Sequence, residues 1–291
     1  TARDKTPYFL TAEHCVWTPS QASSMVFYWN FETAQCRDPG SEPSGTFPAD
    51  SLTVGGWDQT SSGAILRARY GSVHETGTIS GKPDLTLVEI DDEIPSRYQL
   101  FFSGWSRADR APDRSVTIHH PSGHGKRISF DDDPATITAW FERGGGNTHL
   151  RIGDWSQGTT EGGSSGAPLF DTNQRVVGVL SGGHAACDGS RGSEDNNKPD
   201  WYGRLALGFE NGDYQDATMA DFLDPTDSGT RTLDGRNLIN DAVPPARAQN
   251  FRVGEVTPDS VTLRWRAPGD DDLEGTASEY LLKYRSGAPI T

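Results

Sequence analysis

Three side chains in this sequence of 291 residues have the types needed for nucleophilic catalysis by a serine. His14 lies in TAEHC, Asp84 opens the stretch DLTLVEI, and Ser165 lies in GGSSGAPLF. Serine catalysis needs a hydroxyl on a tight turn, a histidine that takes its proton, and a buried carboxylate that orients the histidine. The sequence therefore predicts His14 as the general base, Asp84 as the orienting acid and Ser165 as the nucleophile.

Each of these motifs is weak by itself. A histidine beside a cysteine is more often structural, an aspartate at a strand start is often an exposed cap, and glycine-serine turns are common in loops. The glycines before Ser165 nevertheless permit a strained turn, in which the N–H groups of Gly163 and Ser165 point at an oxyanion. A carboxylate beside apolar residues, such as Asp84, also costs free energy unless it is hydrogen-bonded. We assign no role to Glu13, the neighbour of His14.

Short strands are expected to position these side chains. The chain holds 33 Gly and 18 Pro and few long apolar runs, which favours an all-β fold, a barrel or a sandwich, over a helical bundle. Alternating or apolar runs predict strands at 25–31, 64–70, 84–90, 115–120, 135–141, 148–153 and 175–183. The one convincing helix is ATMADFLDP at 217–225, with Asp216 as its cap and Pro225 beyond its end.

The charge of the chain limits its partners. Lys and Arg together number 26 against 41 for Asp and Glu, so the net charge is −15. An acidic chain repels nucleic acid and anionic membranes, and we expect neither as a partner. No run approaches the roughly 20 apolar residues of a transmembrane helix. Serine catalysis requires no cofactor and no metal.

The order of the three motifs points to a family. His…Asp…Ser is the order of chymotrypsin-type enzymes, unlike that of subtilisin or the α/β-hydrolases. The motifs resemble those of trypsin-like serine proteases, and more closely those of the bacterial lysyl endopeptidase branch. The matching stretches, over about residues 7–237, are YFLTAEHC, YWNF…CR, IHHPSGHGKRIS, THLRIGDW, TEGGSSGAPLF, DWYGRL and ADFLDP…DG. The resemblance implies a secreted endopeptidase with a two-barrel, chymotrypsin-like fold.

The residue that selects the substrate differs from that of trypsin. In trypsin an acidic residue lies six positions before the serine, but this chain has Thr159 there. The lysyl branch places its acid in a D-x-Y-G-R stretch, which here makes Asp200 of PDWYGRL the expected pocket residue. A buried carboxylate would select Lys, possibly Arg, through a charge-assisted hydrogen bond. The expected partners are therefore proteins or peptides with basic residues.

The resemblance also implies a strand that pairs with the substrate backbone. Ser181, Gly182 and Gly183 follow the apolar run VVGVL and correspond to that strand. Trp140 corresponds to a tryptophan that stacks near the catalytic histidine in the lysyl branch. That branch has a histidine where this chain has Ser181, so the aromatic stack around His14 is expected to be shorter.

The cysteines number three, Cys15, Cys36 and Cys187, an odd count for a secreted protein. The resemblance implies that each pairs with a cysteine upstream of the histidine motif. We therefore expect a missing N-terminal segment that carries the first strands of the first barrel, although no signal peptide is visible at Thr1. A local bond between Cys15 and Cys36, with Cys187 free, is the alternative.

The chain is expected to hold two domains. Residues 1–240 form the trypsin-like protease domain, truncated at its N-terminus, and 241–248 form a proline-bearing linker. Residues 249–291 resemble the start of a fibronectin type III module, a β-sandwich, with strands FRVGEV, SVTLRW and YLLKYR and with Trp265 facing inward. The ligand of this module is unknown.

Less specific interpretations stay open. The Asp runs at 131–133 and 270–272 could attract calcium, but solvated turns are favoured. A non-catalytic adhesion or binding protein with a protease-like barrel is the main rival function, and a protease that cleaves after other residues is the second. The histidines outside the triad are expected to be structural or exposed: His74, His119, His120, His124, His149 and His184.

Overall fold

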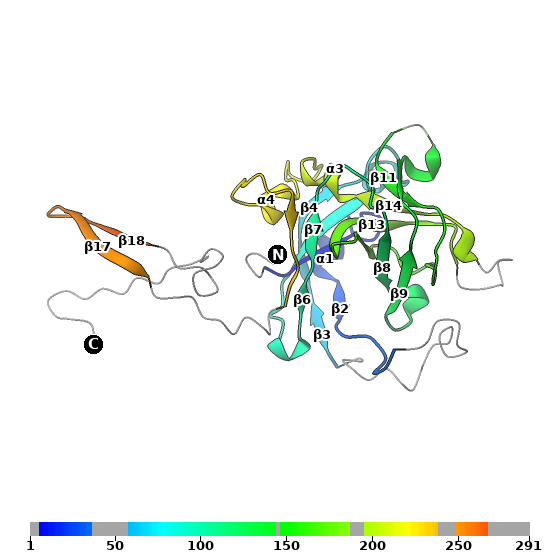
Figure 1. Cartoon of the computed structure of the whole chain (residues 1–291), viewed down its shortest axis with the longest axis horizontal. Coiled ribbons are helices and arrows are strands. Elements are labelled where there is room, and N and C mark those ends of the chain that lie inside the picture. Colours follow the sequence, from blue (N-terminus) through cyan, green and yellow to red (C-terminus); the bar gives the residue numbers. More distant parts are fainter. Residues whose placement is uncertain (1–5, 37–57, 144–145, 187–194, 238–247, 267–291) are drawn as a thin grey trace. The chain divides into compact units, whose positions relative to one another are not determined.

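The computed structural model describes residues 6–36, 58–143, 146–186, 195–237 and 248–266 of the chain. The chain divides into two compact units, Thr1–Arg236 and Asn237–Thr291. Figure 1 shows that strands dominate the first unit and that its helices are short. The predicted all-β fold is therefore confirmed.

The first sheet of this unit brings the histidine and aspartate motifs together. β5 (Leu85–Ile90) lies between β1 (Tyr8–Thr11) and β4 (Ala64–Tyr70), and all pairs are antiparallel. Thr11 at the end of β1 pairs with Thr86 near the start of β5. The segment after β1 therefore meets the residue before β5, so His14 and Asp84 approach each other from opposite strands. β2 (Val26–Tyr28) and β3 (Thr60–Ser62) form a separate antiparallel pair.

A nine-stranded sheet carries the serine motif and the expected substrate pocket. The strands in order are β10 (Thr136–Thr138), β11 (His149–Ile152), β14 (Asp200–Arg204), β13 (Arg175–Gly183), β12 (Pro168–Phe170), β8 (Ser115–His119) and β9 (Arg127–Asp131), joined by β7 (Gly104–Ser106) and β15 (Thr232–Leu233).

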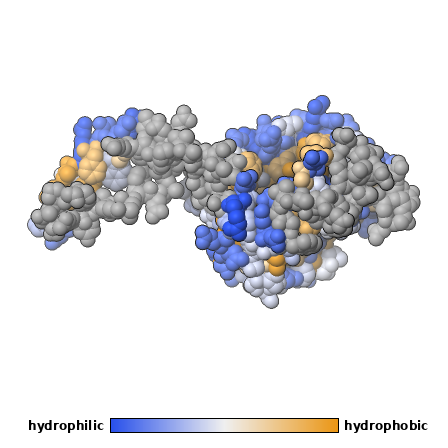
Figure 2. All heavy atoms as spheres, turned by 90° about the horizontal axis from the view of Figure 1, so that it is seen from below, coloured by the Kyte–Doolittle hydropathy of each residue, from blue (hydrophilic) through white to orange (hydrophobic). Residues whose placement is uncertain are grey.

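Apolar side chains pack the two sheets together. The cluster that joins them contains Ala12 and Leu85 from the first sheet region and Val179 from β13. α3 (Leu205–Phe209) adds Leu205 and Phe209 to the same core. Hydrophobic residues also reach the surface of this unit in separate patches among hydrophilic ones (Figure 2). The core therefore fixes the segment that leads to His14 against β13.

The helices of the described residues are short, and none of them has the length and apolarity to cross a lipid bilayer. α1 (Pro19–Ser23) begins with a capping box between Thr18 and Gln21, and α2 is Val73–Thr76. The helix predicted at 217–225 is only α4 (Ala220–Leu223). Asp216 does not cap it, because its backbone is left-handed (φ 57°) and Met219 occupies the N-cap position. That part of the prediction was wrong.

The predicted strands are otherwise found, with some differences in length. The runs at 64–70 and 175–183 correspond in full to β4 and β13, whereas 135–141 gives only β10. β10 is short because a 3₁₀ turn follows at Trp140–Glu142. A small pair, β6 (Phe101–Phe102) with β16 (Arg236–Asn237), has no counterpart in the sequence pattern.

The second unit is described only over two antiparallel strands, β17 (Gln249–Val256) and β18 (Val261–Arg266). They agree with the predicted strands FRVGEV and SVTLRW, while YLLKYR lies outside the described residues. Trp265 stacks on Phe251 with 6.2 Å between ring centroids but stays 37% exposed. The expectation of a buried core tryptophan is therefore not met by the described strands, and the fibronectin type III module stays a prediction.

Candidate active site

Asp84 holds His14 by two hydrogen bonds. Its Oδ2 lies 2.8 Å from His14 Nδ1, and its Oδ1 accepts the His14 backbone N–H at 2.8 Å. Asp84 is fully buried, and its backbone is left-handed (φ 59°), an uncommon conformation for a non-glycine residue. Because a carboxylate only accepts hydrogen bonds, Nδ1 carries the proton. The other nitrogen, Nε2, is left to exchange a proton with a substrate or nucleophile.

The same contacts set the charge of His14. Burial by itself lowers the pKa of an imidazole, but the hydrogen bonds with Asp84 and Cys15 outweigh it and raise the pKa of His14 to about 10. The side chain of His14 is 25% exposed, whereas that of Asp84 is 1% exposed. A buried carboxylate thus stabilises the imidazolium, which is the form that a general base takes after it accepts a proton.

Ser165 lies in a tight turn at 161–167, which we call the nucleophile turn. Four of its amides are used within the protein: Ser164 donates to Glu161 O, Gly166 to Leu180 O, Ala167 to Ser164 O, and Glu161 to Ser164 Oγ. In the described part of the chain, the N–H groups of Gly163 and Ser165 have no such acceptor. Two unpaired amide donors beside a serine hydroxyl are what an oxyanion hole requires.

Only glycine fits at position 163 of the nucleophile turn. Gly163 has φ +95°, and a Cβ atom there would lie 2.8 Å from Ser122 N. The Ser122 N–H in turn donates to Gly162 O at 2.8 Å. The turn therefore lies tightly against the loop after β8, which fixes the direction of the Gly163 amide.

The nucleophile turn also packs against the segment that carries His14. A Cβ atom at Gly166 would collide with Thr11 Oγ1 and lie 3.2 Å from Ala12 N. No hydrogen bond between His14 and Ser165 is formed among the described residues. In ligand-free sites such catalytic hydrogen bonds are often long and close only when substrate binds. The structure thus pairs His14 with Asp84 and puts the turn of Ser165 against the same segment.

An open groove of about 660 Å³ borders the nucleophile turn on another side. Its walls include β1 and the segment around Phe101, and Ser165 and Gly163 lie at its border. Neither His14 nor Asp200 lines it. The groove is therefore separate from the paired His14 and Asp84 and from the expected specificity pocket.

Asp200 is a buried carboxylate with one free oxygen. Its Oδ2 accepts hydrogen bonds from Trp155 Nε1 at 2.7 Å and from Thr160 Oγ1 at 2.6 Å. Its Oδ1 has no hydrogen-bond partner among the described residues. Burial raises the pKa of Asp200 to about 6, against the lowering effect of the hydrogen bonds from Thr160 and Trp155 and of the nearby Ala185 backbone N–H. An unpaired oxygen in a buried carboxylate is suited to a cation supplied from outside.

Glycine keeps the approach to Asp200 open. Gly183 pairs with Asp200 across β13 and β14, and a Cβ atom at Gly183 would collide with Asp200 Oδ1. Gly182, before it, has φ +137° and lies under Trp140, whose Cη2 would be 3.4 Å from a Cβ atom. Ser181 is buried at the bulge where the β13–β14 register shifts. The three predicted strand residues and Trp140 therefore lie together beside Asp200.

A histidine that the sequence analysis treated as structural completes this group. The ring centroid of His149 lies 5.4 Å from that of Trp140, and His149 Nε2 lies 3.2 Å from Ser181 Oγ. The ring also contacts Thr148 Oγ1 through Nδ1 at 2.8 Å, and burial lowers its pKa to about 3. An imidazole from β11 thus packs against Trp140 with the two rings tilted by 41°, although position 181 is a serine. No sequence spacing signalled this, because residues 140, 149 and 181 meet only in the folded sheet.

Glu13, to which no role was assigned, is fully buried. Its carboxylate accepts the backbone N–H groups of Val73 and His74, both at 2.9 Å, and lies 2.7 Å from His74 Nδ1. It thereby caps α2 from a position next to His14. No local pattern signalled these contacts, because the partners of Glu13 lie some sixty residues away along the chain.

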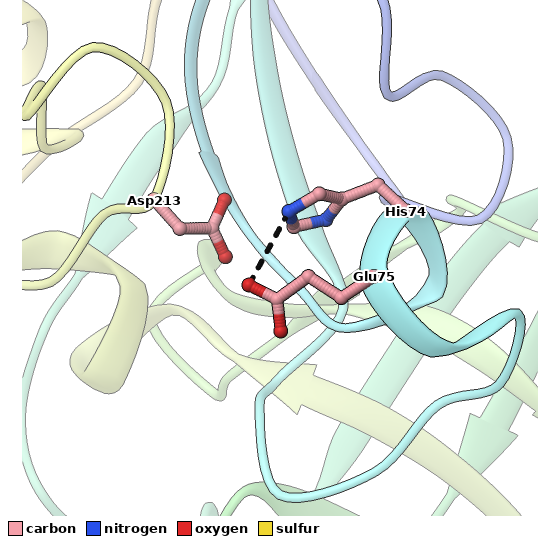
Figure 3. A group of neighbouring side chains, drawn as sticks. All are labelled: His74, Glu75 and Asp213. Carbon is pink, nitrogen blue, oxygen red and sulfur yellow. Dashed lines mark ion pairs between the residues drawn. The ribbon is translucent and has the colours of Figure 1, made fainter.

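A cation already occupies the His74 cluster. His74, Glu75 and Asp213 point toward one another, with His74 Nε2 3.5 Å from Glu75 Oε1 (Figure 3). Lys82 Nζ bridges Glu75 Oε1 at 2.9 Å and Asp213 Oδ2 at 3.0 Å. The ammonium group supplies the positive charge that a metal ion would otherwise bring. We therefore assign no metal here.

The Asp run at 131–133 contributes to a second acidic group. Asp131, Asp133 and Asp154 have carboxylate oxygens within 4.8 Å of one another. Burial and the neighbouring carboxylates raise the pKa of Asp131 to about 6. Exposed acidic groups of this kind occur often without an ion, and calcium binding stays an open alternative for this turn.

Cys15 and Cys36 are exposed free thiols in the structure. The local disulfide between them, which the sequence left open, is therefore not formed. Cys187 lies outside the described residues, so the pairing implied by the resemblance stays a prediction.

The chain is similar to several known proteins. A curated lysyl endopeptidase of Pseudomonas aeruginosa is 27% identical over 188 residues, which are 63% of this chain and 35% of that protein. The chain thus spans about a third of the length of this relative. Among solved structures, a Glu endopeptidase in complex with MPD has 14% identity and a TM-score of 0.38, covering 69% of this chain and 78% of that chain. The HtrA-type protease AlgW with a decapeptide has 16% identity and a TM-score of 0.37, covering 89% and 56%.

A family model matches most of the first unit of the chain. The family described as lysyl endopeptidase, C-terminal domain, matches residues 1–203. This range includes His14, Asp84, Ser165 and Asp200 and makes up more than half of the 291 residues. The chain therefore belongs to the family of lysyl endopeptidase C-terminal domains, and the resemblance seen in the sequence is confirmed.

Proposed function

We propose that this chain is a serine endopeptidase that cleaves peptide bonds after lysine. Ser165 Oγ attacks the carbonyl carbon, and its proton passes to His14 Nε2. Asp84 holds the imidazolium, and the Gly163 and Ser165 N–H groups hold the oxyanion. The observation that carries this proposal is the buried carboxylate of Asp84, which has both oxygens on His14.

The acyl-enzyme then follows from the same groups. His14 returns its proton to the leaving amine as the C–N bond breaks, which leaves an ester on Ser165. A water molecule attacks that ester, gives its proton to His14, and releases the new carboxylate with return of the proton to Ser165 Oγ. His14 exchanges protons in both halves through Nε2, because Asp84 occupies Nδ1 throughout.

The hydrogen bonds of Asp200 favour lysine over arginine. An Arg guanidinium binds a carboxylate best as a fork, with one N–H on each oxygen. Asp200 Oδ2 already accepts two donors, from Trp155 and Thr160, and only Oδ1 is free. A single free oxygen suits the compact ammonium group of lysine. The relative in Pseudomonas aeruginosa carries the name lysyl endopeptidase, which supports the same preference.

The rest of the proposal concerns the substrate backbone and the wider protein. We expect residues 181–183 to pair with the substrate as an added β-strand, and we keep the protein or peptide substrates predicted from the sequence. Secretion, the disulfides, the protease domain at 1–240 and the module at 249–291 also stay predictions.

Cleavage of chromogenic peptides tests the proposal. The full-length protein is offered peptides that end in Lys, Arg or a neutral residue, and we expect cleavage after Lys with a weaker reaction after Arg. Ser165→Ala should abolish it, whereas the exposed Ser23→Ala should leave it unchanged. Absence of serine-dependent cleavage would favour the rival adhesion function, and equal cleavage after a neutral residue would refute the role of Asp200.

A further inference from the structure

A buried histidine connects the nucleophile turn to the sheet behind it. Ser164, which precedes the nucleophile, is 1% exposed, and its Oγ lies 2.8 Å from His119 Nδ1. The other ring nitrogen, Nε2, lies 3.1 Å from Ser129 Oγ on β9. Ser129 Oγ donates to Thr159 O at 3.0 Å, and the Glu161 N–H reaches Ser164 Oγ at 3.4 Å. We call these five residues the His119 chain.

The two ends of the His119 chain fix the direction of every hydrogen bond in it. Thr159 O can only accept, so the Ser129 hydroxyl proton is committed to it and Ser129 Oγ must accept from His119 Nε2–H. In a neutral ring whose proton is on Nε2, Nδ1 is an acceptor, so Ser164 Oγ accepts the Glu161 N–H and gives its own proton to His119 Nδ1. A ring protonated on Nδ1 would leave a buried acceptor without a donor, which costs free energy. The chain is satisfied only by a neutral imidazole with its proton on Nε2.

The surroundings of His119 keep the ring neutral. His119 is 2% exposed, and burial lowers its pKa to about 4, with further lowering by the charges of His120 and Arg127. Arg127 lies on β9, His120 follows His119 on the chain, and Glu161 is the acidic residue of the packed turn. At neutral pH the ring therefore acts as a hydrogen-bond relay of fixed direction, not as an acid or a base.

The His119 chain meets both halves of the proposed site. At one end Ser164 lies between Gly163 and Ser165, whose amides are the free donors of the nucleophile turn. At the other end Thr159 precedes Thr160, whose hydroxyl donates to Asp200 Oδ2 at 2.6 Å. A shift of the His119 ring would therefore move the oxyanion donors relative to the pocket wall.

We propose that His119 is a positioning residue of the proposed protease, which holds the nucleophile turn through Ser164 so that the Gly163 and Ser165 amides face the oxyanion. This role rests on the proposed function. It is distinct from a catalytic role, because among the described residues His119 forms hydrogen bonds with Ser164 and Ser129 and none with Ser165.

Substitutions at His119 distinguish positioning from stability. His119→Leu removes both hydrogen bonds, and we expect kcat to fall by about 10- to 100-fold with little change in KM, because misplaced oxyanion donors act only in the transition state. His119→Asn keeps an acceptor near the Nδ1 position and should recover most of kcat. His124→Leu, a histidine outside the His119 chain, serves as the matched control. A kcat of His119→Leu within threefold of wild type would overturn the proposal.

Two inhibitors supply a readout that a purely structural role would not change. A lysine-ended peptide aldehyde forms a tetrahedral adduct with an oxyanion, whereas the corresponding peptide amide binds without one. In folded His119→Leu, the inhibition constant of the aldehyde should weaken by about 10-fold or more, while that of the amide stays the same. Equal weakening of both would show that His119 only stabilises the fold.

The state of the ring can be tested without any activity. Nitrogen-15 chemical shifts of the wild-type chain at pH 7 report the His119 tautomer, and we expect a neutral ring with its proton on Nε2. A charged ring or the other tautomer would refute the His119 chain even if the protein proves to be a protease. If the tautomer is as expected but no serine-dependent cleavage occurs, the proposed function fails and the positioning role fails with it.

Discussion

Histidines in the two sheet regions differ in charge, although burial by itself lowers the pKa of each of them. His14, beside the first sheet, has its pKa raised to about 10, whereas His119 and His149 in the nine-stranded sheet have theirs lowered to about 4 and 3. His14 faces the carboxylate of Asp84, while His119 and His149 face hydroxyl groups. The partner therefore decides which imidazole can hold a proton and which can only relay a hydrogen bond.

The same difference extends to the residues around these histidines. Near the first sheet, charged groups come in pairs, such as Lys82 with Asp213 and Arg69 with Asp213. In the nine-stranded sheet Asp200 has only uncharged donors, Trp155 and Thr160. Ion pairs also occur on the nine-stranded sheet, such as Arg204 with Asp109, but Asp200 has no charged partner among the described residues. In the proposed function this carboxylate receives its positive charge from the substrate. The proposed enzyme keeps its proton transfer and its substrate selection in separate electrostatic surroundings.

The largest expected effect comes from removing the carboxylate charge that faces His14 beside the first sheet. Asp84→Asn keeps the shape but removes the charge, and it favours the wrong tautomer of His14. We expect kcat to fall by about 10³- to 10⁴-fold, the effect known for the triad aspartate in chymotrypsin-like enzymes. Asp92→Asn, an exposed aspartate that accepts hydrogen bonds from Ser62, should change kcat little. Similar kcat values for the two variants would exclude Asp84 from the mechanism.

The charge of His14 also predicts two pH dependences of opposite sign. A base must be unprotonated, so kcat/KM of the wild type should rise with pH toward about 10. The folded pKa of His14 lies above its ordinary value of 6.5, so its contribution to stability is complete below about pH 6.5 and is lost as pH rises through 10. Urea unfolding at pH 6, 8 and 10 measures this contribution as the difference between the free energies of unfolding of wild type and Asp84→Asn. A difference that widens as pH rises would contradict the prediction.

The next largest effect concerns Asp200, the carboxylate in the nine-stranded sheet that has only uncharged donors. Asp200→Asn removes the charge that faces a lysine side chain, and we expect kcat/KM for Lys peptides to fall by about 10²- to 10³-fold. The pKa of Asp200 is about 6, so the wild type should also lose its preference for Lys as pH falls through 6. The measured ratio of cleavage after Lys to cleavage after a neutral residue should follow both changes. A ratio that is unchanged in Asp200→Asn would move the specificity pocket elsewhere.

Much of the molecule could be predicted from local sequence, but its connecting contacts could not. Strands such as β4 and β13 were visible because alternation and apolar runs report burial of a strand directly. The order of His14, Asp84 and Ser165 named the family. Asp200 was found only through that resemblance, since a buried acid in a strand has no local signature.

The contacts that were missed all join residues far apart in the chain. Glu13 reaches α2, and His149 meets Trp140 and Ser181, each through contacts that only the folded sheets create. Asp216 failed as a helix cap because its left-handed backbone begins a different turn. Local patterns specify an element, whereas these roles depend on which elements become neighbours.

The smallest expected effect concerns Glu13, and it separates structural support of the segment around His14 from catalysis. Glu13→Gln replaces one acceptor oxygen by an amide donor, which then faces the N–H groups of Val73 and His74. One buried N–H is left without an acceptor, so the free energy of unfolding should fall by about 1–3 kcal/mol. The effect on kcat should be much smaller than that of Asp84→Asn, because Asp84 still holds His14 by two hydrogen bonds.

A matched glutamate makes the Glu13 result interpretable. Glu89 forms a partly exposed ion pair with Arg67 at 2.7 Å, and such pairs contribute only about 0–1 kcal/mol. Glu89→Gln should therefore change the free energy of unfolding by less than Glu13→Gln, as measured by urea denaturation at pH 7. If the two variants are equally stable, the buried Glu13 contacts add no more than a surface pair. If instead Glu13→Gln lowers kcat as much as Asp84→Asn, the orientation of His14 depends on α2, and the base is positioned by a charged network wider than its pair with Asp84.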